Sequence, residues 1–416
     1  MIRANAAFAL LLAGLITAPA PVRALELEPV SDARVLGPLA AGETLQYVGY
    51  AANPSSQVVY RAEIQSAAGQ VEEEGLYFRE GAGTLTVAIS GGVADTPTRW
   101  FAEPDGSAVF LTPAIDADGR VAFAARFHEG ASPDALWGLF VHEDGALHLA
   151  LAPGVTVPGR AATFTRYGAP RFTEDGALVF AGYFDPFNDG RNPRADGIFV
   201  WDGVSMTALA LANDVAPGGR PFVSFGSPRT AGALIVFHAG LEAGPGADEG
   251  LYLSSGGVLS VMLAPTGIAP GTGGSAFSAL RGEEFSVNAA GEIAYAACYG
   301  ECLFNRGVFH RDVFGVESIA VFNLFDPLDS FAGAGSPTIG ETGAVGFTGA
   351  RLADGASGVW RRDGGALLSV ALAGSPIGGP DLEFHQALGP PVDDGAGNLV
   401  FSSISNLGYA RLLLAR

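Results

Sequence analysis

The sequence predicts an all-β fold, a seven-bladed β-propeller with four strands in each blade. Three observations support this prediction: a repeat that recurs seven times, short alternating apolar runs between turn residues, and a composition with 59 Gly and 27 Phe in 416 residues. Many glycines and few charges suit short buried strands joined by tight turns. Acidic disordered chains are poor in apolar residues, whereas 48% of this sequence is hydrophobic.

The repeat consists of a turn residue, a glycine three positions later and an aromatic residue four positions after that. The copy from Asn288 to Tyr295 is the most regular, and the copy from Asp116 to Phe123 keeps the same spacing. Asn or Asp followed by Gly forms a tight turn because these residues tolerate positive φ. The alternating run that follows is typical of a strand with one buried face. The seven aromatic residues are Tyr60, Phe123, Phe180, Phe237, Tyr295, Phe347 and Phe401.

Three further strands recur in phase with this motif. One begins with Gly, an apolar residue and an aromatic residue, as at 75–77 and 250–252. A strand rich in Leu and Val follows, and a Pro-Gly connection then leads to a strand that starts with Phe and carries Pro six residues later, as at Phe164 and Pro170. Four short strands per repeat fit one propeller blade. A single unit cannot cover its own faces, so neighbouring units must stack.

The motif resembles that of a secreted bacterial tandem-repeat family named for its Asn-x-x-Gly-x-x-Ala-Phe sequence, whose members carry varied C-terminal anchors. The copy from Asn288 to Tyr295 matches closely, the other six are degenerate, and the resemblance spans the chain from residue 25 onwards. It implies a propeller-like secreted or surface protein and brings no catalytic residues with it. The C-terminus of this chain shows no such anchor, so we expect a soluble product.

The phase of the repeat predicts that the blades close into a ring. The tight turn makes the Phe-led strand and the motif strand antiparallel neighbours, so the Pro-Gly connection crosses between blades. Counted this way, the last blade lacks its fourth strand, and residues 25–37 precede the first inner strand without a blade of their own. We expect this N-terminal segment to close the last blade as its outer strand and so remove free sheet edges.

The first 24 residues have the features of a secretory signal peptide. Arg3 gives a positive start, residues 6–17 form an apolar segment too short to span a bilayer, and residues 22–24 form a small-x-small cleavage site. We therefore expect residues 25–416 to form a single propeller domain that is secreted or periplasmic, without membrane insertion.

The charge of the chain limits its partners. The formal net charge is −20, and all 23 basic residues are arginines. Such an acidic chain is repelled by phosphate backbones and by anionic membrane surfaces. We therefore expect no nucleic-acid partner, but a monomer whose partner is a protein or a glycan.

Cys298 and Cys302 are the only cysteines. In an exported protein they predict a disulfide across the loop that follows the motif strand. Free thiols are the first alternative. A zinc site is disfavoured because it needs four ligands.

One long loop gathers oxygen ligands with turn residues. It predicts a Ca²⁺ site, because hard cations bind carboxylate and carbonyl oxygens, and it makes calcium the one cofactor considered. The alternative is a solvated loop that uses the same residues for turns, since the spacing is not that of an EF-hand. The candidate calcium ligands are Asp185, Asn188, Asp189 and Asp196.

Several charged residues lie on or near the expected inner strands, where a ligand in the channel would meet them. The alternative is a set of charges solvated by channel water. Crossovers and second-to-third-strand loops vary most in length, so we expect the binding surface on the face where they emerge. The candidate ligand-binding residues are Arg166, Arg171, Arg229, Arg281 and Glu283.

The chain contains no Gly-x-Ser-x-Gly elbow, His-Glu-x-x-His helix or phosphate loop. The favoured function is therefore a non-catalytic exported propeller that binds a protein or a glycan through its variable-loop face. One alternative is a polysaccharide hydrolase or lyase with paired carboxylates at the channel mouth. Another is a structural component of the cell envelope.

Overall fold

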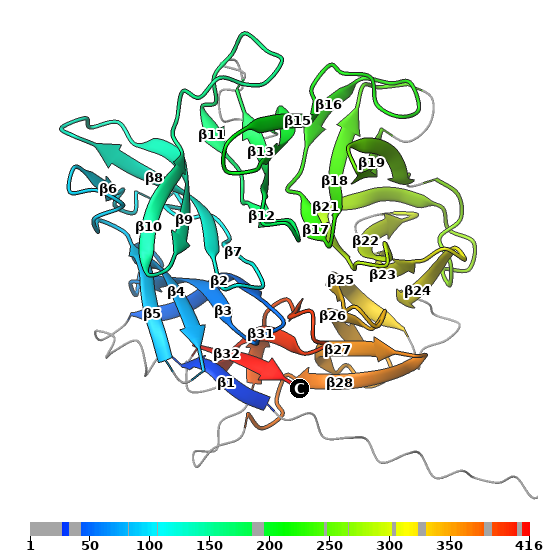
Figure 1. The fold of residues 1–416 in the computed structure, drawn as a ribbon. Helices are drawn as coiled ribbons and strands as arrows, with labels where there is room; N and C mark the ends of the chain where they lie inside the picture. Colours follow the sequence, from blue (N-terminus) through cyan, green and yellow to red (C-terminus); the bar gives the residue numbers. More distant parts are fainter. Residues whose placement is uncertain are drawn as a thin grey trace, which may run out of the picture.

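The computed structural model describes residues 27–32, 43–81, 83–105, 107–184, 195–244, 248–264, 266–301, 305–322, 330–377, 385–405 and 410–416. Within these ranges the chain forms strands β1 to β32 and no helix, so no described helix could cross a membrane. The strands form seven sheets around a central axis (Figure 1). The predicted all-β, seven-bladed propeller is confirmed.

In blades 1 to 6 the strands follow one another along the chain from the axis outwards, whereas blade 7 takes its outermost strand from the start of the described chain. Blade 1 contains β2 (Thr44–Ala52), β3 (Val58–Gln65), β4 (Val71–Glu80) and β5 (Gly83–Ile89). Blade 2 contains β6 (Arg99–Phe101), β7 (Ala114–Ile115), β8 (Val121–Glu129), β9 (Leu136–Glu143) and β10 (Ala146–Leu151). Blade 3 contains β11 (Arg166–Tyr167), β12 (Arg171–Phe172), β13 (Leu178–Tyr183), β14 (Gly197–Trp201) and β15 (Met206–Leu211). Blade 4 contains β16 (Phe222–Phe225), β17 (Arg229–Ala231), β18 (Leu234–Leu241), β19 (Glu249–Ser255) and β20 (Val258–Leu263).

The remaining blades follow the same order. Blades 5 and 6 contain β21 (Phe277–Val287), β22 (Ile293–Tyr299), β23 (Arg306–Arg311) and β24 (Val316–Ala320), then β25 (Phe331–Ile339), β26 (Val345–Arg351), β27 (Ser357–Asp363) and β28 (Ala366–Leu372). Blade 7 contains β29 (His385–Leu388), β30 (Val392–Asp393), β31 (Leu399–Ser405), β32 (Ala410–Ala415) and β1 (Leu27–Asp32). In blades 2, 3, 4 and 7 the innermost strand is split into two pieces, both paired with the second strand.

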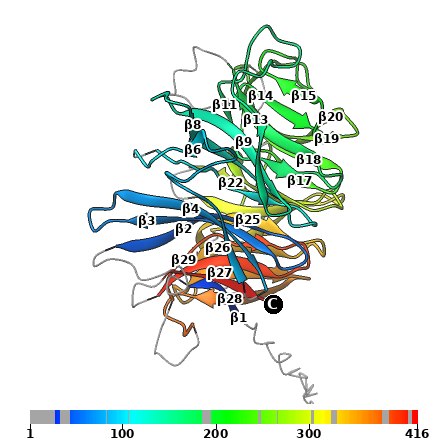
Figure 2. The same cartoon turned by 60° about the vertical axis from the view of Figure 1, so that its left-hand side comes forward.

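The two ends of the chain meet in blade 7. β1 pairs antiparallel with β32, with Leu27 opposite Ala415 and Asp32 opposite Arg411. Figures 1 and 2 both show β1 beside the C-terminal strand. The predicted closure by an N-terminal outer strand is confirmed, and it joins the first and last parts of the chain in one sheet.

The motif aromatics form the core of the blades. Phe123, Phe180 and Phe237 are each 0% exposed, and each stacks on the aromatic residue of the third strand. The ring centroids of Phe123 and Phe140 lie 5.6 Å apart, and those of Phe180 and Phe199 lie 5.8 Å apart. Stacked aromatic pairs of this kind add to the free energy of burial. The sequence repeat therefore sets the positions of the buried aromatic residues in the blades.

The Asx turns close the hairpins and also link neighbouring blades. The Asn53 side-chain oxygen accepts the Gln57 N–H at 3.0 Å, while its amide donates to the Asp116 carbonyl of blade 2 at 2.7 Å. Asn288 makes the equivalent link, donating to the Gly340 carbonyl of blade 6 at 3.2 Å. Asp116 itself accepts N–H groups of its own turn. These residues serve turn geometry and blade packing, as Asx turns elsewhere do.

A carboxylate directly before the glycine of the third strand contacts the next blade, as at Glu74 and Glu249. Glu74 is buried and accepts the N–H groups of residues 109–110 of blade 2 at 3.0 and 2.6 Å, and Arg61 lies 2.8 Å from it. Burial raises the pKa of Glu74, and the charge of Arg61 opposes that shift. Glu249 occupies the equivalent position in blade 4 and accepts the Leu280 N–H of blade 5 at 2.6 Å. Buried acceptors of this kind fix the contact between blades.

Two sequence predictions depend on residues outside the described ranges. The proposed signal peptide, residues 1–24, lies entirely outside them. Cys298 lies buried on β22, whereas Cys302 is outside the described residues. The signal peptide and the disulfide therefore stay predictions.

Replacing Glu74 by Ala should lower the free energy of unfolding by about 3 kcal/mol, because two buried N–H groups would lose their acceptor and Arg61 would keep only Glu63 as a carboxylate partner. Denaturant unfolding followed by circular dichroism measures this. Glu72→Ala is the control, since it removes the same charge from an exposed position on the same strand and should change stability by less than about 0.5 kcal/mol. Equal losses in the two variants would contradict this contact.

Candidate functional site

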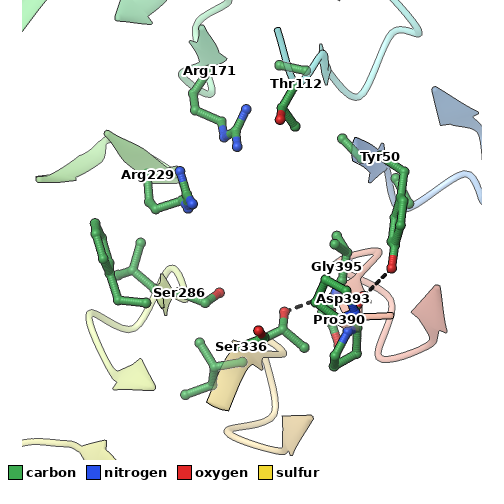
Figure 3. A pocket seen from close by; sticks show the side chains of 18 of the residues that line it. Tyr50, Thr112, Arg171, Arg229, Ser286, Ser336, Pro390, Asp393 and Gly395 are labelled. Carbon is green, nitrogen blue, oxygen red and sulfur yellow. Dashed lines mark hydrogen bonds between the residues drawn. The ribbon is translucent and has the colours of Figure 1, made fainter. Parts of the chain in front are cut away.

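A cavity of about 520 Å³ lies in the central channel, and all seven blades contribute to its wall (Figure 3). The lining comes from the C-terminal ends of the innermost strands and from turn residues such as Glu341 and Gly395. The cavity therefore lies toward the tight-turn end of the channel. The crossover face, where we expected the binding surface, is the other end.

Seven equivalent residues form a ring in the wall of this cavity. Each lies on an innermost strand opposite the residue that precedes the motif aromatic, so strand alternation gives all seven the same orientation in their blades. Only two ring members are charged, and these lie on the adjacent blades 3 and 4. We call this set the channel ring; its members are Ala51, Ala114, Arg171, Arg229, Ser286, Thr338 and Val392.

Arg171 and Arg229 are positioned by the prolines that precede them. Proline has no N–H to donate to the sheet, and in both blades the innermost strand is interrupted before the arginine. The Arg171 guanidinium donates to the Pro170 carbonyl at 2.8 Å, and that of Arg229 donates to the Pro228 carbonyl at 3.2 Å. Arg229 also lies 5.5 Å from the centre of the Phe285 ring. Both guanidinium groups point into the cavity (Figure 3).

Tyr50 lies in the opposite wall and joins blades 1 and 7. Its hydroxyl donates to the Pro390 carbonyl and accepts the Ser402 N–H at 3.1 Å. Burial raises the pKa of Tyr50 far above its usual range, so the phenol stays neutral. Its contribution to the site is a fixed wall.

Asp393 is an acid of the cavity lining whose pKa is shifted toward neutral pH. Its carboxylate accepts the Gly395 N–H at 2.8 Å, and its own N–H donates to the Thr338 hydroxyl at 3.0 Å. Burial raises the pKa of Asp393 to about 6, and the charges of Asp394 and Glu341 act in the same direction. It lies across the cavity from the two arginines (Figure 3).

The other described acids in the lining have partners within the protein. Glu284 forms an ion pair with Arg306 and accepts the Ser336 N–H at 2.9 Å. Glu341 accepts the Ala289 N–H at 3.1 Å. Glu284 and Glu341 are therefore held by protein donors, and the two arginines lie across the cavity from Asp393.

The structure brings two of the five predicted ligand residues, Arg171 and Arg229, into one cavity. Arg166 lies elsewhere, with its guanidinium 4.7 Å from the Trp137 ring and 5.1 Å from the Tyr183 ring. Arg281 is exposed and lies 3.6 Å from Glu284, outside the cavity lining. The side chain of the fifth predicted residue, Glu283, is not among those described.

Sequence reasoning missed Asp393, although the repeat held a signal for it. Asp393 lies opposite Leu399, two residues before the motif aromatic Phe401. The other six blades place an uncharged residue at the same register. An acid at a register position that is uncharged in the other blades is a signal that could have identified Asp393. The six counterparts are Ala52, Ile115, Phe172, Thr230, Val287 and Ile339.

The predicted calcium ligands are only partly described. Asp185, Asn188 and Asp189 lie outside the described residues. The Asp196 carboxylate accepts the Phe184 N–H at 2.8 Å and so ties the two ends of the loop together. Among the described residues, no group of three His, Cys, Asp or Glu side chains could hold a metal ion. The calcium site stays a prediction.

Residues 35–319 match a family described as a family of unknown function (DUF7453). No curated protein matches the chain in sequence.

Three solved structures are similar in fold. A prolyl endopeptidase is 14% identical with a TM-score of 0.47, over 89% of this chain and 46% of its own. An acylaminoacyl peptidase from Pyrococcus horikoshii is 12% identical with a TM-score of 0.48, over 86% and 49%. A GH74 xyloglucanase from Xanthomonas campestris is 14% identical with a TM-score of 0.45, over 91% and 52%. The chain spans about half the length of each.

Asp393→Asn should gain stability relative to the wild type as the pH rises. The raised pKa of Asp393 means that its favourable protonated form is present at pH 4 and is lost as the pH passes through about 6. We compare the free energy of unfolding of the variant with that of the wild type at pH 4 and at pH 7.5. The variant's value minus the wild type's should be about 2 kcal/mol larger at pH 7.5 than at pH 4. Asp118→Asn, an exposed acid on the turn of blade 2, is the control. The same trend in both variants would contradict burial as the cause.

Proposed function

We propose that this protein, which belongs to the DUF7453 family of unknown function, is a non-catalytic exported propeller that binds the acidic group of a glycan in its channel. The observation that carries the proposal is the pair Arg171 and Arg229, at equivalent ring positions on adjacent blades and directed into one cavity. Export rests on the signal-peptide features of residues 1–24 and on the resemblance to a secreted repeat family.

Two neighbouring guanidinium groups suit a planar anion. Arginine presents a fixed fork of donors that matches a carboxylate or a sulfate, and such charge-assisted hydrogen bonds are the strong ones. The chain as a whole is strongly acidic, with a net charge of −20. A local cationic wall inside a confined channel therefore supplies a directional attraction that the outer surface lacks.

The rest of the cavity suits sugar hydroxyls. Thr112, Ser286 and Ser336 add hydroxyl groups to the lining, and the Asp393 carboxylate lies across from the arginines. A volume of about 520 Å³ falls in the range of small-molecule sites. A site inside a channel admits a sugar or a chain end and excludes a folded protein, which supports the glycan over the protein among the predicted partners.

A glycosidase would need two carboxylates in this site, because glycoside cleavage uses an acid and a second carboxylate. Among the described acids of the lining, Glu284 and Glu341 are engaged with protein donors. Asp393 has a pKa raised to about 6, a value that suits a general acid. This one observation favours a second candidate, a polysaccharide hydrolase or lyase.

Calorimetry with glucuronate and with short oligogalacturonates tests the binding site. Arg171→Gln and Arg229→Gln should each weaken binding by about tenfold or more, because each removes a charge-assisted hydrogen bond. Arg79→Gln is the matched control, since it removes an arginine of β4 that is not in the cavity lining. Binding that is unaffected by both cavity variants would rule out the channel site.

The same ligands should bind more tightly at pH 5 than at pH 7.5, by about three- to tenfold. Asp393 is mostly protonated below its raised pKa of about 6, so a nearby negative charge that repels the ligand disappears. Asp393→Asn should bind at pH 7.5 about as tightly as the wild type does at pH 5. A pH dependence that survives this substitution would assign it to another group.

Release of reducing ends or unsaturated products from the same glycans, measured in parallel, separates the two candidates. Robust turnover by the wild type, lost in Asp393→Asn, would establish the catalytic candidate. Binding without turnover at pH 5 and at pH 7.5 is the result expected of a binding protein.

A further inference from the structure

A second hollow lies on the crossover face of blade 2, on elements that do not line the channel cavity. Two adjacent clefts of about 490 and 270 Å³ share Asp105 and Arg126 in their walls. Trp100 lies in the first cleft and Trp137 in the second. We call this hollow the crossover groove. It is on the face where loop length varies most, which the sequence marked as the place for a binding surface.

We propose that the crossover groove binds a neutral, hydroxyl-rich glycan chain, with one sugar ring stacked on Trp100. The register of blade 2 places the aromatic and charged side chains of the groove on one face of the sheet. Trp100 on β6 lies opposite His128 on β8, and Trp137 on β9 lies opposite Arg126 on β8. Residues 126 and 128 are two apart, so their side chains share a face.

Trp100 offers an open aromatic surface in this groove. It is 36% exposed, and its ring stacks on that of His128 with centroids 6.1 Å apart and an angle of 28°. The backbone of β6 is held by Arg99, which bridges Asp95 and Glu129 at 3.0 and 2.7 Å. A fixed aromatic ring that already packs on one neighbour loses little conformational entropy when a ligand covers it.

The far half of the groove is pre-formed by one ion pair and one cation–π contact. Arg126 donates to both carboxylate oxygens of Asp105, at 2.7 and 2.6 Å. This contact holds the pKa of Asp105 well below its usual range. Arg166 lies 4.7 Å from the centre of the Trp137 ring. The predicted ligand residue Arg166 thus packs on Trp137 as part of the groove wall, and Trp100 is the more open of the two indoles.

The acids beside Trp100 select the chemistry of the ligand. Glu103 and Asp134 line the same cleft and are exposed. An apolar protein segment laid on Trp100 would desolvate these carboxylates without offering donors, at a cost in free energy. A polyanion would be repelled by them and by the acidic surface. A neutral pyranose has an apolar C–H face for the indole and hydroxyl donors for the carboxylates, and it meets both demands.

This inference does not depend on the proposed channel function. The channel site uses arginines of blades 3 and 4 and an anionic group, whereas the groove uses an indole and carboxylates of blade 2. Variants of the two sites should therefore act separately. Arg171→Gln should leave binding of a neutral glycan unchanged, and Trp100→Ala should leave binding of glucuronate unchanged.

Fluorescence titration and calorimetry of the purified protein with cellohexaose, xylohexaose and mannohexaose test the proposal. At least one of these should bind the wild type, and Trp100→Ala should weaken that binding by about tenfold, the loss typical of removing a central aromatic anchor. Trp100→Phe should keep part of the affinity. Glu103→Gln should weaken it by a smaller factor, because the amide still accepts a hydroxyl proton.

Phe314→Ala is the matched control, since Phe314 is 94% exposed on blade 5, away from the groove, and its loss should leave the affinity unchanged. The proposal is overturned if none of the three hexaoses binds the wild type. It is overturned equally if Trp100→Ala and Phe314→Ala bind as the wild type does, or if oligogalacturonates bind at Trp100 more tightly than the neutral chains.

Discussion

The antiparallel pairing of β1 with β32 is the interaction on which the rest of the structure depends. It places the first and last strands of the described chain in one sheet, so that each blade has two neighbours and buries both faces. Tyr50 secures the same junction, because its hydroxyl bonds to Pro390 and to Ser402 across blades 1 and 7. Without this closure the channel cavity would lose part of its wall, since all seven blades contribute to it.

Repetition fixes the backbone and leaves the ring side chains free to differ. The Asx turns, the stacked aromatics and the contact at Glu74 maintain the blades and their contacts. The channel ring, by contrast, only has to line a cavity, so no packing rule dictates its side chains. Arginines at two adjacent ring positions, and Asp393 next to the ring member Val392, give the cavity wall two basic side chains and one titratable acid.

The two candidate sites lie toward opposite ends of the propeller and differ in their side chains. The channel places two guanidinium groups in one cavity of an acidic chain, and the proposed anion site rests on them. The crossover groove joins an open indole to carboxylates, which favours hydroxyl donors.

The sequence by itself determined the blade number, the strand order and the closing strand, because these follow from the phase of a local repeat of turns and alternating apolar residues. It also identified Arg171 and Arg229, which follow prolines of the innermost strands. Only the tertiary structure decided that Arg281 lies outside the cavity, at a register shift between Leu280 and Phe285, and that Arg166 packs on Trp137. The raised pKa of Asp393 and the groove beside Trp100 likewise follow only from the tertiary structure. Burial, bulges and contacts between blades arise from segments distant in sequence, which meet only when the ring closes.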